Sequence, residues 1–174
     1  MGVITEVKRQ IKRPRRIEGI TKATEDRMRE FDATMELGED IMIPKGIGGL
    51  DANQYKAKLG SKGIENIEYE ILYKAGTRIN PLDYMVFNES LVFIDGEDES
   101  QKEFAHKYQD KNGFAKIILV NGEPGFKEVE GKEYCYYYDQ WGAYSNRFNI
   151  VYVPSVVYQK EGEKVLTIEE VKVE

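Results

Sequence analysis

The apolar residues of the last third of the chain follow the two-residue repeat of β-strands on either side of a turn. Residues 155–158 are rich in β-branched side chains, and Pro154 stands immediately before them, where a strand tolerates a missing N–H group. Residues 159–163 are polar and contain a glycine, and an extended pattern resumes at 164–168. The pattern predicts an antiparallel hairpin. Residues 142–150 carry apolar positions at rough helical spacing, so a helix is expected before the proline.

Two earlier runs, 91–94 and 117–120, are almost continuously apolar, which is typical of strands that are buried on both faces. Between them, Asp98 and Gln101 have the spacing of a helix N-cap and the reciprocal member of a capping box. A helix is therefore expected at 99–111.

The acidic residues 95–99 were weighed as a cation site, because hard cations bind several carboxylates. They lack the ligand spacing of an EF-hand loop, so helix capping is the favoured interpretation. His106 lies on the predicted helix with no nucleophile or second ligand in evidence, which favours a structural role. No metal site, cofactor site or catalytic residue is predicted.

The most aromatic part of the chain is the run from Tyr134 to Tyr138, followed closely by Trp141. A two-residue period places Tyr134, Tyr136 and Tyr138 on one face of a strand. Such a face suits either packing under a helix, which is the default expectation, or an exposed interface. Tyr136, Tyr138 and Trp141 are the candidate residues for a partner-binding patch. Cys135 has no basic neighbour in the sequence and is interpreted as a buried apolar residue.

The first half of the chain has weaker patterns. Apolar residues at helical spacing between positions 3 and 11 and a capped turn from Thr24 to Phe31 predict a partly helical start. Short strands and turns are expected at 35–50, and a strand at 64–73. We therefore predict three parts: a basic, partly helical N-terminal arm (1–30), a small β-rich extension (31–86) and an α/β domain (87–174).

The composition is that of an ordinary globular protein, with 41% hydrophobic and 32% charged residues among 174. A single cysteine excludes an intramolecular disulfide, a CxxC motif and a thiolate metal cluster. No apolar run approaches the length of about 18 residues that a membrane helix needs. The first residues lack the apolar stretch of a signal peptide, which fits a cytoplasmic protein or a mature exported one equally well.

Charge is distributed unevenly along the chain. The net charge is −6, but residues 1–20 carry a local charge of +4, which leaves −10 for the rest. A solvated tail is the favoured reading, because no aromatic residue interleaves the basic ones to stack on nucleic-acid bases. The alternative is an arm that binds an anionic partner. The basic residues of this arm are Lys8, Arg9, Lys12, Arg13, Arg15 and Arg16.

Six ordered motifs resemble the TraW family of F-type conjugative type IV secretion systems. They read GTRINPLDY, LVFIDGEDESQ, KIILVNG, YYDQWG, RFNIVYVPSVVYQKEG and LTIEE, and upstream KRPRRIEGITKATEDR and FDATM resemble the same family. The likeness covers most of the chain. The family has a small residue where this chain has Trp141 and a glycine in place of Asn149, and the segment 48–66 is long by comparison.

The resemblance implies a thioredoxin-like C-terminal half: an α/β three-layer sandwich with a mixed sheet and a β-hairpin after a cis proline, preceded by a β-containing extension. We expect a cis Val153-Pro154 bond that faces Gly96 to Glu99. It also implies a periplasmic pilus-assembly protein whose signal peptide has been removed, with TrbC-like and TraU-like proteins as partners. No direct contact with nucleic acid and no membrane span is expected.

A non-enzymatic, protein-binding scaffold is the favoured function. The dithiol of a thioredoxin enzyme would fall at Gly96 to Glu99, where carboxylates cannot exchange thiols. Two alternatives stay open. One is a thiol-dependent redox or chaperone-like enzyme that uses Cys135, and the other is an anion-binding module that acts through residues 8–16.

Overall fold

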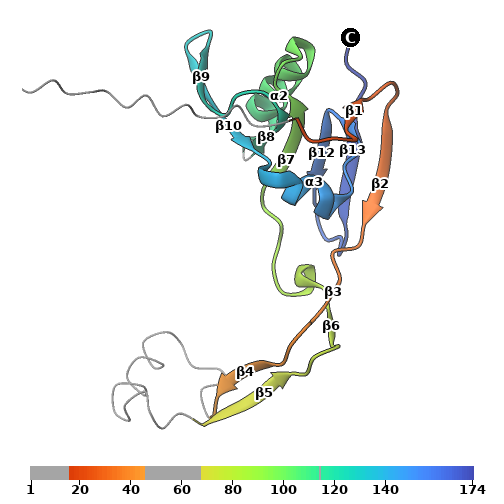
Figure 1. The fold of residues 1–174 in the computed structure, drawn as a ribbon, viewed down its shortest axis with the longest axis vertical. Coiled ribbons are helices and arrows are strands. Elements are labelled where there is room, and N and C mark those ends of the chain that lie inside the picture. Colours follow the sequence, from red (N-terminus) through yellow and green to blue (C-terminus); the bar gives the residue numbers. More distant parts are fainter. Residues whose placement is uncertain (1–15, 46–67, 114) are drawn as a thin grey trace, which may run out of the picture. The chain divides into compact units, whose positions relative to one another are not determined.

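The computed structural model describes residues 16–45, 68–113 and 115–174. The chain divides into two units, a main unit that comprises 85–174 together with the residues up to Asp32, and a smaller unit from Ala33 to Tyr84 (Figure 1). The helix expected between residues 3 and 11, the long segment 48–66 and all basic residues of the arm except Arg16 lie outside the described residues.

The main unit is built on a seven-stranded mixed sheet with the order β2-β13-β12-β7-β8-β10-β9. Strands β7, β8 and β10 run parallel to one another, and every other neighbouring pair is antiparallel. The strands are β2 (Arg27–Phe31), β7 (Ser90–Asp95), β8 (Ala115–Asn121), β9 (Gly125–Val129), β10 (Lys132–Tyr138), β12 (Ser155–Tyr158) and β13 (Leu166–Glu170). The structure confirms the two buried strands, the tyrosine-rich strand and the C-terminal hairpin.

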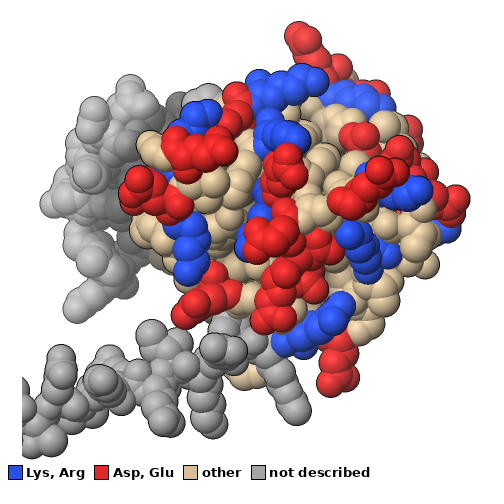
Figure 2. Space-filling view, turned by 90° about the horizontal axis from the view of Figure 1, so that it is seen from above, with Lys and Arg blue, Asp and Glu red and all other residues tan. Residues whose placement is uncertain are grey.

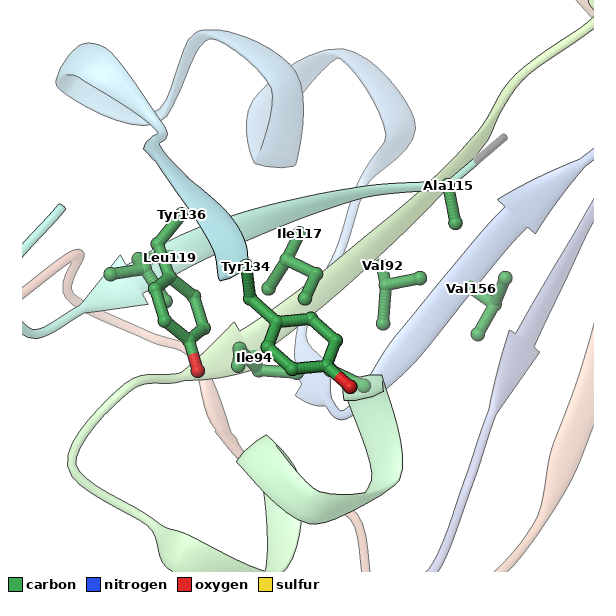
Figure 3. Close-up of a cluster of buried hydrophobic side chains, with 9 residues drawn as sticks. Val92, Ile94, Ala115, Ile117, Leu119, Tyr134, Tyr136 and Val156 are labelled. Carbon is green, nitrogen blue, oxygen red and sulfur yellow. The ribbon is translucent and has the colours of Figure 1, made fainter. Parts of the chain in front are cut away.

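Helices α2 (Glu99–Asn112) and α3 (Ala143–Phe148) pack on opposite faces of this sheet. Alternate residues of β7 point to opposite faces. Val92 and Ile94 belong to the buried cluster that contains Ala105 of α2, as Figure 3 shows for the strand residues. Phe93 instead meets Phe148 of α3, with 6.4 Å between ring centroids. Both helices were predicted, and each lies within two residues of the expected bounds.

The segment before the hairpin is also paired. Strand β11 (Tyr152–Val153) runs parallel to β1 (Thr21–Lys22), and the Ala23 N–H donates to the Val153 carbonyl at 2.8 Å. The Val153-Pro154 bond is cis, as predicted.

The prediction of a helical turn between Thr24 and Phe31 is wrong. Residues 27–31 form strand β2, which pairs antiparallel with β13 along its whole length. Phe31 packs edge-on against Phe148 with 5.3 Å between ring centroids. Tertiary pairing here overrides a weak local pattern, because the edge of β13 offers hydrogen bonds and Phe148 offers apolar contact. The main unit therefore includes residues on both sides of position 30, where the arm was predicted to end.

In its described residues, 33–45 and 68–84, the smaller unit forms two short antiparallel pairs. Strand β3 (Met35–Glu36) pairs with β6 (Arg78–Ile79), and β4 (Ile41–Pro44) pairs with β5 (Tyr69–Tyr73). The 3-10 turn η2 (Pro81–Asp83) follows and is capped by the side chain of Asn80. The strand predicted at 64–73 is present over 69–73, and residues 64–67 lie outside the described residues.

Candidate functional site

The turn between β7 and α2 is the segment in which a thioredoxin-like enzyme would carry its dithiol. Asp98 caps the helix, and its Oδ1 accepts hydrogen bonds from the backbone N–H groups of Ser100 at 3.0 Å and Gln101 at 3.3 Å. The Gln101 Oε1 accepts from the N–H of Asp95 at 2.9 Å. The capping-box spacing had predicted that this side chain would return to Asp98, and the Gln101 Nε2 donates to the Asp98 Oδ2 at 3.3 Å. Buried Gln101 thus also ties the end of β7 to the first turn of α2.

The carboxylate of Asp98 is held in its charged form. The hydroxyl of Ser100 donates to it at 2.7 Å and lowers its pKa well below the usual range of an aspartate, with a further contribution from Lys22 at 3.0 Å. Lys22 is the residue that β1 places opposite Val153. Lys22 thus connects two segments: its strand pairs with Val153, next to the cis proline, and its side chain pairs with Asp98 at the start of α2.

A groove of about 710 Å³ opens beside this turn. Its walls come from the turn, the first half of α2, the end of β8 and strand β9. At its base the ends of β7 and β8 come so close that only glycine fits: a Cβ on Gly96 would lie 2.9 Å from the Asn121 carbonyl oxygen. Gly122 has φ +102° and faces the Cα of Gly96, so a side chain there would be strained as well as crowded.

His106 and Tyr136 meet in the inner part of this groove. The His106 Nε2 lies 2.5 Å from the Tyr136 hydroxyl, and the imidazole stacks on Tyr134 at 3.9 Å between ring centroids. Burial lowers the pKa of His106 and raises that of Tyr136, so both groups favour the neutral form. A neutral imidazole can accept the tyrosine proton in a hydrogen bond. The structural role that was predicted for His106 agrees with this packing.

Two of the three predicted partner-binding residues belong to the interior. Tyr136 is 5% exposed and packs with Tyr134 against α2, and Figure 3 shows both rings on the side of the sheet that carries Ile117 and Leu119. Half-buried Tyr138 packs against the same cluster. The default expectation of packing is confirmed for this face, and the expectation that Tyr136 is displayed to a partner is wrong. Helix α2 covers that face, which the local alternation could not reveal.

Trp141 has the opposite surroundings. It is 95% exposed and adopts a left-handed backbone conformation with φ 59° inside the 3-10 turn η3 (Gln140–Gly142). Tyr137 and Tyr144, on either side of it in sequence, are 47% and 51% exposed. Both tyrosines lie close enough to Lys116 to raise its pKa, after the larger effect of its hydrogen bond to Glu89. We call Tyr137, Trp141 and Tyr144 the aromatic patch.

Tyr137 and Tyr144 are not among the residues predicted to bind a partner. The two-residue period places Tyr137 on the face of its strand opposite Tyr136, and Tyr144 falls within the helix predicted at 142–150. The two-residue period could have predicted the exposure of Tyr137. If Tyr136 and Tyr138 pack under a helix, the residue between them points to the opposite face of the strand, away from α2.

Of the remaining candidates, Cys135 contacts one residue of the patch, and Arg16 is the only basic residue of the arm within the described residues. Cys135 is a free thiol that is half-buried rather than fully buried, and its contact with the Tyr137 hydroxyl raises the pKa of that tyrosine. Arg16 forms an ion pair with Asp95 at 3.8 Å. In the described parts of the chain, no three His, Cys, Asp or Glu side chains converge so as to hold a metal ion.

Comparison with known proteins gave one curated relative that bears on function. Neither a family model nor a solved structure matches the chain. Protein TraW of Escherichia coli (strain K12) is 28% identical over 159 residues, a match that covers 90% of this chain and 63% of the relative. The chain thus spans less than two thirds of that protein's length. No helix among the described residues is long and apolar enough to cross a membrane. The match to Protein TraW supports the membership of the TraW family that the sequence motifs suggested.

Proposed function

We propose that this protein is a non-enzymatic, periplasmic assembly factor of a conjugative pilus of the F type, and that it works as a protein-binding scaffold in plasmid transfer. The support for the biological setting is the match to Protein TraW, which extends over 90% of the chain. Other periplasmic pilus-assembly proteins, TrbC-like and TraU-like, are the proposed partners.

We further propose that the main unit is a thioredoxin-like fold. Its central strands have the order β13-β12-β7-β8, with α2 between parallel β7 and β8 and an antiparallel hairpin at the end of the chain. Strand β2 extends this core at one edge, and the hairpin of β9 and β10 extends it at the other. The helices on the two faces provide the outer layers of a three-layer sandwich.

The proposal of a non-enzymatic role rests on the chemistry of the β7–α2 turn. The residues at this position, Gly96 to Glu99, provide carboxylates that cap a helix and carry no sulfur. Cys135 lies on β10, whose neighbour β8 separates it from the strand that precedes the turn. A fold of this type carries no activity by itself, so the function is sought in its surfaces.

The aromatic patch is the observation that favours a binding role. A tryptophan that is 95% exposed contributes little to burial on folding, and a left-handed backbone conformation is unfavourable for it. For both reasons, Trp141 contributes little to the stability of the protein when no partner is bound. Tryptophan and tyrosine are the side chains that most often dominate the binding energy of protein interfaces.

Co-purification tests this proposal. Cells that contain the conjugation system would express tagged protein with a signal peptide, and the periplasmic pilus proteins that it retains would be identified. Replacing Trp141 with alanine is expected to weaken capture by about 2 kcal/mol or more, because it removes a central aromatic contact. Tyr69→Ala, which removes a half-exposed ring of the smaller unit, serves as the matched control.

Equal capture by the wild type, Trp141→Ala and Tyr69→Ala would show that the aromatic patch is not the contact surface. Retention of no pilus protein by the wild type would contradict the scaffold function itself.

A further inference from the structure

The groove beside α2 is strongly acidic. Five glutamates and two lysines line it. Glu99 pairs with Lys102, Glu103 with Lys107 and Glu123 with Lys127, whereas Glu97 and Glu128 form no ion pair with a cation of the described residues. Figure 2 views the molecule from the end at which α2 and β9 lie in Figure 1, and acidic side chains gather on this face with basic ones between and around them.

The shape of the groove suits a chain segment more than a single ion. Its volume of about 710 Å³ lies within the range of roughly 300–1,000 Å³ that is typical of ligand sites. Its carboxylates are spread over the β7–α2 turn, the helix and β9, so they do not converge on one point. A ligand that meets all of them has to be extended and has to carry several positive charges.

Strand β9, which forms one wall, offers backbone groups as well as charge. Among the described strands it pairs with β10 on one side, and no described strand pairs with its other side. Exposed Phe126 lies on this strand, with 68% of its surface accessible. An extended segment can add to such an edge through main-chain hydrogen bonds while its side chains reach neighbouring carboxylates.

We infer that this groove binds an extended, lysine- or arginine-rich segment of a partner protein. The inference rests on the proposed scaffold function, to which it adds the chemistry of one partner and a second contact surface. Anionic ligands such as nucleic acids are repelled by the same carboxylates. Glu97 comes from the β7–α2 turn and Glu128 from β9, and among the described residues they provide the unpaired charges that the segment neutralises.

Binding of a defined peptide tests the inference. The probe is a short fluorescent peptide with lysine at alternate positions, and its affinity for the whole chain is measured by anisotropy at low and high salt. We expect binding that weakens with salt. Reversing both unpaired charges, in the double variant Glu97→Lys with Glu128→Lys, is expected to weaken the affinity at least about tenfold, because attraction becomes repulsion.

The matched control reverses two exposed glutamates outside the groove, Glu161→Lys with Glu174→Lys, and so changes the net charge equally. Circular dichroism establishes that both double variants are folded. An equal loss of affinity in the two variants would overturn the inference by showing general charge attraction. Binding of a peptide with glutamate in place of lysine, or displacement of the lysine peptide by Ca²⁺ at matched ionic strength, would overturn it too.

The two proposals can fail separately. Trp141→Ala is expected to leave the affinity for the lysine peptide within about twofold, because the aromatic patch does not line the groove. Peptide binding without capture of any pilus protein would contradict the scaffold function alone. Normal capture without peptide binding would contradict the groove assignment alone.

Discussion

Single side chains at the β7–α2 turn have structural roles that their contacts make plain. Asp98 accepts bonds from two backbone N–H groups and one hydroxyl, and it pairs with Lys22 from β1. The same carboxylate therefore caps the helix and links the N-terminal segment to the sheet. Gly96 complements it, because the close approach of the β7 and β8 ends leaves no room for a Cβ.

Replacing Asp98 with alanine tests this role. We expect the free energy of unfolding to fall by about 1–2 kcal/mol at neutral pH, because two N–H groups lose their acceptor. The folded-state pKa of Asp98 is lowered, so its stabilising effect is present above the unfolded value of about 3.9 and is lost as pH falls through the folded value. Urea unfolding at neutral and acidic pH measures both effects, and the difference between wild type and variant should shrink in acid.

The control is Glu97→Ala, one residue earlier and exposed, which should change stability by less than about 0.5 kcal/mol. A difference between wild type and Asp98→Ala that persists unchanged well below the lowered pKa would show that the charge of Asp98 is not what stabilises the turn.

In strand β10 and the turn after it, buried side chains and exposed side chains lie within a few positions of one another. Tyr134 and Tyr136 point toward α2, Tyr137 points to the other face, and Trp141 stands in the turn that follows. The alternation is a local property, but which face becomes interior depends on where α2 packs. An exposed tryptophan at φ 59° is the feature of this region that folding does not require.

Alanine substitutions at these two kinds of position should differ strongly in how much stability they cost. Tyr136→Ala is expected to cost about 3 kcal/mol or more, because it leaves a cavity under α2 and removes the hydrogen-bond partner of His106. Trp141→Ala should change stability by no more than about 0.5 kcal/mol. Thermal and chemical unfolding of the two variants provides the comparison.

A conservative variant separates the two losses at Tyr136. Tyr136→Phe keeps the ring and removes only the hydroxyl, so its cost should lie near 1–2 kcal/mol, well below that of the alanine variant. Destabilisation by Trp141→Ala as large as that by Tyr136→Ala would mean that the tryptophan is part of the packed structure.

At the level of the whole molecule, the chain leaves the main unit after Asp32 and returns to it at Met85. The main unit combines residues from before and after this excursion, since β2 pairs with β13 and β1 pairs with β11. Among the described residues, the strands of the smaller unit form two-stranded pairs. Isolated two-stranded pairs are marginally stable in water, whereas a seven-stranded sheet with a helix on each face has a substantial core.

Removal of the smaller unit tests whether the main unit folds independently. A chain in which a Gly/Ser linker replaces residues 33–84 is expected to unfold cooperatively, with a midpoint close to that of the full chain, because the sheet pairings are all retained. Unfolding monitored by near-ultraviolet circular dichroism, which reports the buried tyrosines, and by far-ultraviolet circular dichroism, which reports the backbone, should give coincident transitions. Loss of the cooperative transition would show that the main unit depends on the smaller one.

Local patterns were sufficient for much of the fold. The apolar runs at β7 and β8, the Asp98 cap and the hairpin around residues 155–170 follow from nearest neighbours in the chain, because a strand's alternation and a helix's cap are short-range properties. Motifs in order along the chain were also sufficient to indicate the TraW family, which the match to Protein TraW supports. Segment 27–31 could not be predicted in this way, because its strand exists through hydrogen bonds to β13, which is distant in sequence.

The binding surfaces could be assigned only from the folded chain. Whether the row of Tyr134, Tyr136 and Tyr138 lies in the interior or at an interface depends on the element that packs against it. Helix α2 covers the face of Tyr136. The acidic groove brings together residues of the β7–α2 turn, α2, β8 and β9 that no sequence spacing associates. A charge pattern in sequence specifies net charge, whereas a concave acidic site is a property of three-dimensional packing, because it depends on which walls face each other.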